Sequence, residues 1–171
     1  MTTEFAPDCP NCAALCCLAL AFDAGEMFAH DKAAGVPCHR LAGTACSIHA
    51  DLAQKGYKGC VAFDCLGAGQ RVTALFTENW QQHPAMTGPM MEAFRKMRSV
   101  RELQQMLVAA ETLPLPEHAA SERQAWSDRL SAACDDLDRL EAFDPAPLRQ
   151  WLKGLATYVR RDAARQDRPE L

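Results

Sequence analysis

A chain of 171 residues, 49% of them hydrophobic, has enough apolar material for one ordinary domain or two small ones, which excludes a disordered polymer. Its formal net charge is −4, and basic residues are interleaved with acidic ones, so the chain offers no basic surface for a nucleic-acid backbone. We therefore expect no nucleic-acid partner.

The longest apolar run, residues 13–22, has about half of the ~20 residues that a membrane-spanning helix needs. A signal peptide would require basic residues before that run, but the first basic residue is Lys32. We therefore expect no membrane span and a cytoplasmic location.

Cysteine is the most informative residue type, because eight of the nine cysteines fall between residues 9 and 65. A reducing cytoplasm keeps thiols as thiols or metal thiolates, so metal ligation is the leading interpretation. The alternatives are disulfides, reactive thiols, a zinc ion that only staples a small fold, and cysteines packed as small hydrophobes. The candidate metal ligands are Cys9, Cys12, Cys16, Cys17, Cys38, Cys46, Cys60 and Cys65.

At the start of the chain, Cys9 and Cys12 form a C-x-x-C motif whose spacing lets both sulfurs reach one tetrahedral ion. The alanine, leucine and cysteine residues of segment 13–22 favour a helix. On such a helix Cys12 and Cys16 lie four positions apart on one face. Cys17 points about 100° away from Cys16, so one of these neighbouring thiols serves a second site or simply packs.

The other four cysteines arrive on separate loops between residues 38 and 65, as a closed metal site requires. Ser47 is expected to cap a short helix over residues 48–54. Residues 66–70, Leu-Gly-Ala-Gly-Gln, resemble a phosphate-binding loop only weakly, because the Gly-Lys-Ser/Thr of that motif is missing. We expect these glycines to turn the backbone beside the metal and to begin a helix in which Val72, Phe76 and Trp80 recur.

A change in composition near residues 83–89 predicts two domains, a cysteine-rich module over residues 1–85 and a helical module over residues 86–171. Prolines at positions 114, 116 and 145 separate three amphipathic stretches in the second module. The apolar stripes are Met90, Phe94, Met97, Leu103, Leu107 and Ala110; then Trp126, Leu130, Ala133, Leu137 and Leu140; then Leu148, Trp151, Leu152, Leu155, Tyr158 and Val159.

The first stripe is consistent with one helix or with two shorter ones, because Ser99 and Glu102 have the spacing of a capping box. Cys134 borders the second stripe and is expected in the core. The predicted fold is mainly α: an irregular, metal-stapled N-terminal module with short helices, followed by a helical hairpin or three-helix bundle. The helical module is also the expected surface for a protein partner.

The order of the cysteines resembles that of the CxxCxxCC cysteine-cluster family (YkgJ-like), whose members are described as zinc- or iron-chelating proteins. The matching groups are Cys9, Cys12, Cys16 and Cys17; Cys38 and Cys46-Ser47-Ile48; and Cys60-x-x-Phe63-x-Cys65. The first group departs from the family pattern, since Ala13-Ala14-Leu15 stands where the family has glycine and one further residue. Residues 15–70 also resemble the cysteine-containing segment that precedes the repeats of some bacterial pentapeptide-repeat proteins.

We therefore expect a metal-chelating protein that binds zinc or an iron–sulfur cluster through its N-terminal cysteines. His30, His39 and His49 lie in the same stretch, and each could replace a thiolate. The alternatives are an iron–sulfur-dependent redox enzyme or accessory protein, and a thiol–disulfide redox protein acting through Cys9 and Cys12. The sequence contains no carboxylate pair, Ser/His/Asp order or nucleotide fingerprint that would support catalysis.

Overall fold

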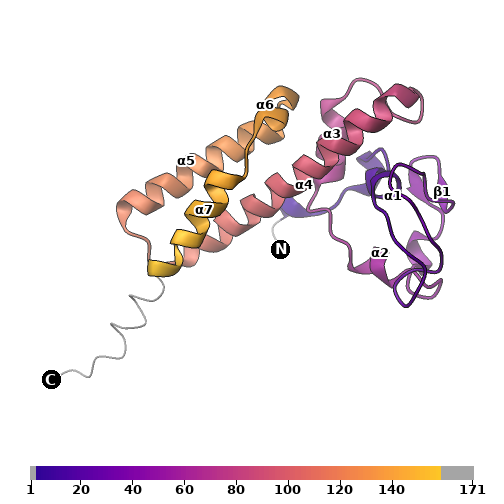
Figure 1. Ribbon diagram of the computed structural model, residues 1–171, viewed down its shortest axis with the longest axis horizontal. Coiled ribbons are helices and arrows are strands. Elements are labelled where there is room, and N and C mark those ends of the chain that lie inside the picture. The colour runs from indigo at the N-terminus through magenta and orange to yellow at the C-terminus, as the bar shows by residue number, and fades with distance from the viewer. Residues whose placement is uncertain (1–2, 159–171) are drawn as a thin grey trace. The chain divides into compact units, whose positions relative to one another are not determined.

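The structure, a computed structural model, describes residues 3–158 and divides into two compact units (Figure 1). The first unit ends at Arg98 and the second begins at Ser99. Helices dominate the described residues, which confirms the mainly α fold. The division between the units falls inside a long helix, on the C-terminal side of the composition change at residue 85, and the domain boundary at residues 85–86 stays a prediction.

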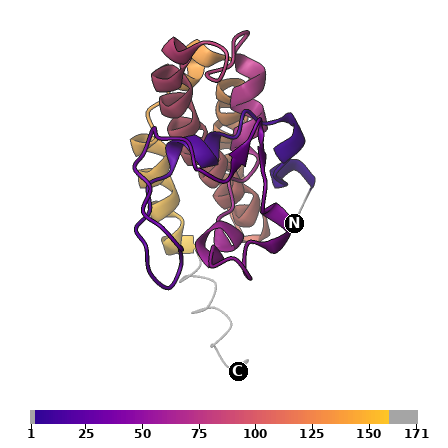
Figure 2. The same cartoon turned by 90° about the vertical axis from the view of Figure 1, so that its right-hand side faces the viewer.

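The first unit consists of short helices joined by long loops, which face the viewer in Figure 2. Its elements, with η marking 3₁₀ helices, are η1 (Thr3–Phe5), η2 (Cys9–Asn11), α1 (Leu15–Ala19), β1 (Leu41–Ala42), β2 (Ala45–Cys46), η3 (His49–Asp51), α2 (Lys58–Ala62), α3 (Ala68–Leu75), η4 (Pro84–Met86) and the first part of α4 (Thr87–Ala109). Its buried apolar side chains include Leu15 and Leu18 of α1, Val72 of α3, and Met90, Phe94 and Met97 of α4.

Helix α1 is shorter than the helix expected over residues 13–22. Ala14 adopts a left-handed conformation with φ 55°, which stops the helix from extending toward Cys12. The backbone of Ala13 is bound elsewhere: its N–H donates to Thr73 Oγ1 at 2.9 Å, and its carbonyl accepts from Trp80 Nε1 at 2.6 Å. Cys12 therefore lies outside the helix that carries Cys16 and Cys17.

Helix α3 also ends earlier than expected, because Phe76 is extended and Trp80 lies beyond the helix. The hydrogen bond from the Trp80 indole to Ala13 explains why Trp80 is buried without being helical. The helix expected over residues 48–54 is reduced to η3, and Ser47 does not cap it. Instead, the Ser47 hydroxyl donates to the Arg40 carbonyl at 2.8 Å across the hairpin.

A two-stranded antiparallel hairpin, β1–β2, occupies part of the segment between Cys38 and Cys65. It pairs Leu41 with Cys46 and Ala42 with Ala45. Gly43 adopts the positive φ of 60° that its tight turn needs. The hairpin fixes the direction from which Cys46 approaches the other cysteines.

The second unit contains the end of α4, η5 (Ala110–Thr112), α5 (Glu117–Cys134), α6 (Leu137–Ala142) and α7 (Ala146–Gly154). The end of α4, α5 and α7 run side by side and reverse direction in turn (Figure 1). Hydrogen bonds link them: Arg149 of α7 donates to Ser99 at 3.1 Å, and Trp151 donates to Glu122 of α5 at 2.5 Å. Their buried side chains include Val100, Leu103, Leu107, Leu130, Ala133, Cys134, Leu140, Leu148 and Leu155.

This arrangement agrees with three of the predicted features of the helical half. The segment around Pro114 and Pro116 separates α4 from α5, Pro145 precedes α7, and Cys134 is in the core. Two details differ. Ser99 does not begin a new helix, since α4 continues through it. The second stripe is divided into α5 and α6, because Asp136 is extended and its carboxylate accepts from the Arg139 N–H at 2.9 Å.

Val159, the last residue of the third stripe, lies outside the described residues. Within residues 3–158, no helix is both long enough and apolar enough to cross a membrane.

Candidate metal centre

Helix α3 holds the N-terminal loop that carries Cys9 and Cys12. The Gln70 side chain accepts from the Asp8 N–H at 3.2 Å and donates to the Ala6 carbonyl at 2.9 Å. One turn further on, Thr73 Oγ1 accepts from the Ala13 N–H and donates to the Gly69 carbonyl, both at 2.9 Å. The bonds of Gln70 to Asp8 and Ala6 and of Thr73 to Ala13 connect residues 60 to 64 positions apart in the sequence and fix the loop against the helix.

Four cysteines line one pocket beside this loop and α3. Cys9, Cys12, Cys16 and Cys65 line one small pocket of about 20 Å³, together with Gly69, Gln70 and Phe94 among others. Such a volume holds roughly one water-sized occupant. Cys9 and Cys12 come from η2 and its end, Cys16 comes from α1, and Cys65 comes from the loop before α3.

Gly69 makes room for one of these sulfurs. A Cβ atom at position 69 would lie 2.6 Å from Cys12 Sγ, closer than the two atoms can approach. Gly69 is buried within α3 and has ordinary helical geometry, so its conformational freedom is not what the position uses. The missing side chain gives the Cys12 thiol its place in the pocket.

Burial raises the pKa of the Cys9 and Cys12 thiols, and the neighbouring Cys16 and Cys65 raise both further. Hydrogen bonds from the backbone N–H groups of Leu15 and Ala14 lower the pKa of Cys12 and offset part of this increase. Neighbouring thiolates repel one another, so a cation bound between them favours their deprotonated forms. The electrostatics of the pocket therefore suit a metal ion that displaces the thiol protons.

The pKa values of the adjacent thiols Cys16 and Cys17 are shifted in opposite directions. A hydrogen bond from the Cys17 thiol, backbone N–H groups and the nearby Lys32 lower the pKa of Cys16. The same hydrogen bond raises the pKa of Cys17, as do burial and the thiols of Cys16, Cys46 and Cys38. Cys16 lines the four-cysteine pocket, whereas Cys17 does not.

Four of the predicted ligands, Cys17, Cys38, Cys46 and Cys60, do not line this pocket, and we call them the second group. The Cys38 N–H donates to the Cys17 carbonyl at 3.0 Å. Burial raises the pKa of Cys60 to about 11, with further increases from Cys16, Cys38 and Cys46.

Lys32 provides a buried cation beside this second group. Its side chain is 6% exposed, and Nζ donates to the carbonyls of Leu18, Leu20 and Ala33 at 3.0, 2.5 and 3.2 Å. Burial lowers the pKa of Lys32, and the nearby thiols, Cys38 first, act in the opposite direction. A buried ammonium beside thiolates offsets part of their negative charge. No sequence motif marks Lys32 as a site residue, although it is the first lysine or arginine of the chain.

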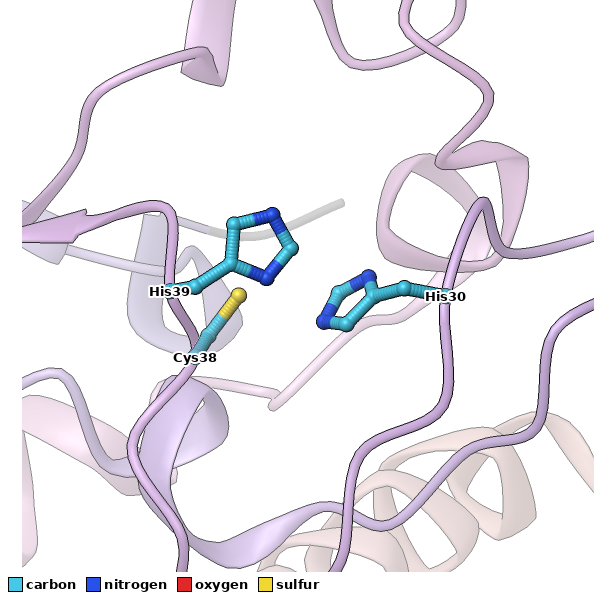
Figure 3. Close-up of side chains that lie close together, drawn as sticks. All are labelled: His30, Cys38 and His39. Carbon is cyan, nitrogen blue, oxygen red and sulfur yellow. The ribbon is translucent and has the colours of Figure 1, made fainter.

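His30 and His39 approach one member of the second group. The ligand atoms of His30, Cys38 and His39 lie within 4.8 Å of one another, and Figure 3 shows the two rings and the Cys38 thiol close together. His49, the third histidine considered from the sequence, is exposed and does not belong to this group. All nine cysteines are free thiols in the structure.

Comparison with known proteins finds a relative whose name states no function. The chain is 34% identical over 130 residues to a Bacillus subtilis (strain 168) protein named "Uncharacterized protein YybG". The match covers 74% of this chain but 47% of the relative, so the chain spans about half the length of that curated protein. No family model matches the chain, and no solved structure matches it.

Proposed function

We propose that this chain is a metal-binding protein whose main centre is formed by Cys9, Cys12, Cys16 and Cys65. The observation that carries the proposal is that these four thiols, from three separate segments, line one small pocket. Cysteine-only ligation is compatible with zinc and with an iron–sulfur cluster. Four cysteines are a usual ligand set for a structural zinc ion, so zinc is the first candidate.

The other four predicted ligands, Cys17, Cys38, Cys46 and Cys60, do not line this pocket, and their part in metal binding stays a prediction from the sequence. The proposal includes a cytoplasmic location, because a reducing compartment keeps such thiols available for metal. A protein partner for the helical half stays a prediction from the sequence.

The first test is the metal content of protein purified without oxygen. We expect zinc bound to the chain, without acid-labile sulfide. Iron together with sulfide and a broad visible absorption band would instead identify an iron–sulfur protein and favour the redox alternative. Metal-free protein that also fails to bind added zinc or to accept a reconstituted cluster would contradict the proposal.

Two glycine-to-alanine variants test whether the metal binds in this pocket. Gly69→Ala places a methyl group against Cys12 Sγ, whereas Gly88→Ala, also in a helix of the first unit, meets nothing within 4 Å. Alanine favours a helix over glycine by roughly 1 kcal/mol, so neither change should unfold the protein. We expect Gly69→Ala to weaken zinc binding by roughly 10–100-fold, as misplaced ligand geometry does elsewhere, and Gly88→Ala to leave it unchanged.

Competition with a coloured zinc chelator measures both affinities, and far-UV circular dichroism confirms that the variants are folded. Equal affinities for folded Gly69→Ala and Gly88→Ala would place the metal outside this pocket. Cys65→Ser gives a second check, because it removes a ligand without adding volume.

A further inference from the structure

The group formed by His30, Cys38 and His39 has the composition and spacing of a mixed nitrogen–sulfur metal site. Its ligand atoms lie within 4.8 Å of one another, and the two imidazole rings have centroids 4.1 Å apart at an angle of 74°. His30 and Cys38 are half-buried, while His39 is exposed. None of the thiols in the four-cysteine pocket takes part.

The Tyr57 hydroxyl contacts both imidazole rings. Its side chain is 2% exposed, and its hydroxyl lies 3.1 Å from His30 Nδ1 and 3.5 Å from His39 Nε2. Arg40 Nε also donates to this hydroxyl, at 3.5 Å. Phe22 packs edge-on against the His30 ring with centroids 5.1 Å apart, which further limits its rotation.

These contacts decide which nitrogens are available to a ligand. With His30 Nδ1 and His39 Nε2 at the tyrosine, the other nitrogens are His30 Nε2 and His39 Nδ1. In Figure 3 one nitrogen of each ring points toward the Cys38 thiol. Histidine ligands in proteins are oriented in this way, by a hydrogen bond at the ring nitrogen that does not bind the metal.

We propose that His30 Nε2, Cys38 Sγ and His39 Nδ1 bind a divalent transition-metal ion, zinc foremost, with Tyr57 as the positioning residue. Imidazole and thiolate are both good ligands for zinc. Three protein ligands leave a fourth position for water or another small ligand. This site goes beyond the proposed four-cysteine centre and does not depend on it.

The direct test observes the histidine rings of the full wild-type chain. The probe is Zn²⁺, added without oxygen to reduced, metal-free, ¹⁵N-labelled protein, and the readout is the long-range proton–nitrogen spectrum of the imidazoles. Of the five histidines in the chain, we expect two to show coordination shifts, at Nε2 of His30 and Nδ1 of His39. Zinc binding without these shifts, or coordination by His49 instead, would overturn the inference.

Matched variants separate this site from the four-cysteine pocket. His30→Gln with His39→Gln should lower the zinc content by one ion per chain, whereas His49→Gln, an exposed histidine outside the group, should not. Cys9→Ser with Cys65→Ser should keep both histidine shifts. Loss of those shifts in the cysteine variant would overturn an independent site. If the cysteine variant also keeps its full zinc content, the four-cysteine proposal fails and this one stands.

Tyr57→Phe tests the positioning role, because it keeps the buried ring and removes only the hydroxyl. We expect a roughly 10–100-fold weaker zinc affinity, the range usual for partners that orient a metal-bound histidine. The spectrum should also show the His30 ring no longer fixed in one tautomer. Unchanged affinity with an unchanged tautomer would remove Tyr57 from the site. Should the double histidine variant fail to fold, the wild-type spectrum alone decides the proposal.

Discussion

Cys16 and Cys60 have identical side chains, but their surroundings shift the pKa of the two thiols in opposite directions. A hydrogen bond from Cys17, backbone N–H groups and Lys32 favour the thiolate of Cys16. Burial and nearby thiols disfavour the thiolate of Cys60 and raise its pKa to about 11. Both residues are half-buried in the structure.

We predict that iodoacetamide at pH 8 modifies Cys16 faster than Cys60 in the reduced, metal-free protein. The thiolate is the reacting species, and a lowered pKa keeps it populated at lower pH. As the pH falls from 10 to 7, Cys60 should lose its reactivity before Cys16 does. Peptide mapping by mass spectrometry after short exposures measures both rates, with buried Cys134 as the slow reference. Faster labelling of Cys60 would contradict the order.

At the level of elements, the second unit depends on one face of each helix. Along α4 the residues Val100, Leu103 and Leu107 are almost fully buried, whereas Met106 and Val108 are 53% and 42% exposed. This alternation is the helical period of an amphipathic segment packed against its neighbours. Burial of that face stabilises α4, and the exposed residues contribute little.

Leu107→Ala and Met106→Ala provide a comparison between neighbours in the same helix. Leu107 is 1% exposed, so its truncation should cost about 2–5 kcal/mol of unfolding free energy through lost burial and a cavity. Met106→Ala should stay within about 0.5 kcal/mol, as most surface changes do. Urea denaturation of both variants under the same metal conditions measures the difference. Similar losses for the two would mean that the assigned buried face is wrong.

At the level of the whole molecule, the two units differ in what holds them together. Helices α1 and α2 have five residues each, far fewer than the ~12–15 that an isolated helix needs to persist. The segment between them contains Cys38, Cys46 and buried Lys32, while Cys17 and Cys60 lie in α1 and α2 themselves. The second unit instead contains α5, which has 18 residues, and an apolar core of its own.

We therefore predict that metal removal loosens the first unit and spares the second. Hydrogen–deuterium exchange with a strong zinc chelator should show lost protection in residues 9–65, while α5 and α7 keep theirs. The same chelator, already saturated with zinc, is the control. Equal loss in both units, or no loss in the cysteine-rich segment, would show that metal does not stabilise the first unit in this way.

The mainly α fold and the helices of the second half could be predicted from the sequence, because apolar periodicity and helix-breaking prolines act over a few residues. Leu103, Leu107, Leu130 and Leu148 are buried as their spacing indicates. The concentration of cysteines also predicted the region of the candidate site. These features depend on local chemistry, which a single sequence displays directly.

The tertiary structure decided which of these residues meet. Cys65 lines the same pocket as Cys9, Cys12 and Cys16 because Thr73 and Gln70 tie the N-terminal loop to α3, whereas Cys17 does not line it. Likewise, His30 lies near Cys38 and His39 with its Nδ1 3.1 Å from the Tyr57 hydroxyl, a contact that no sequence motif identifies. Such pairings depend on hydrogen bonds and close packing between distant segments, and local sequence patterns do not contain that information.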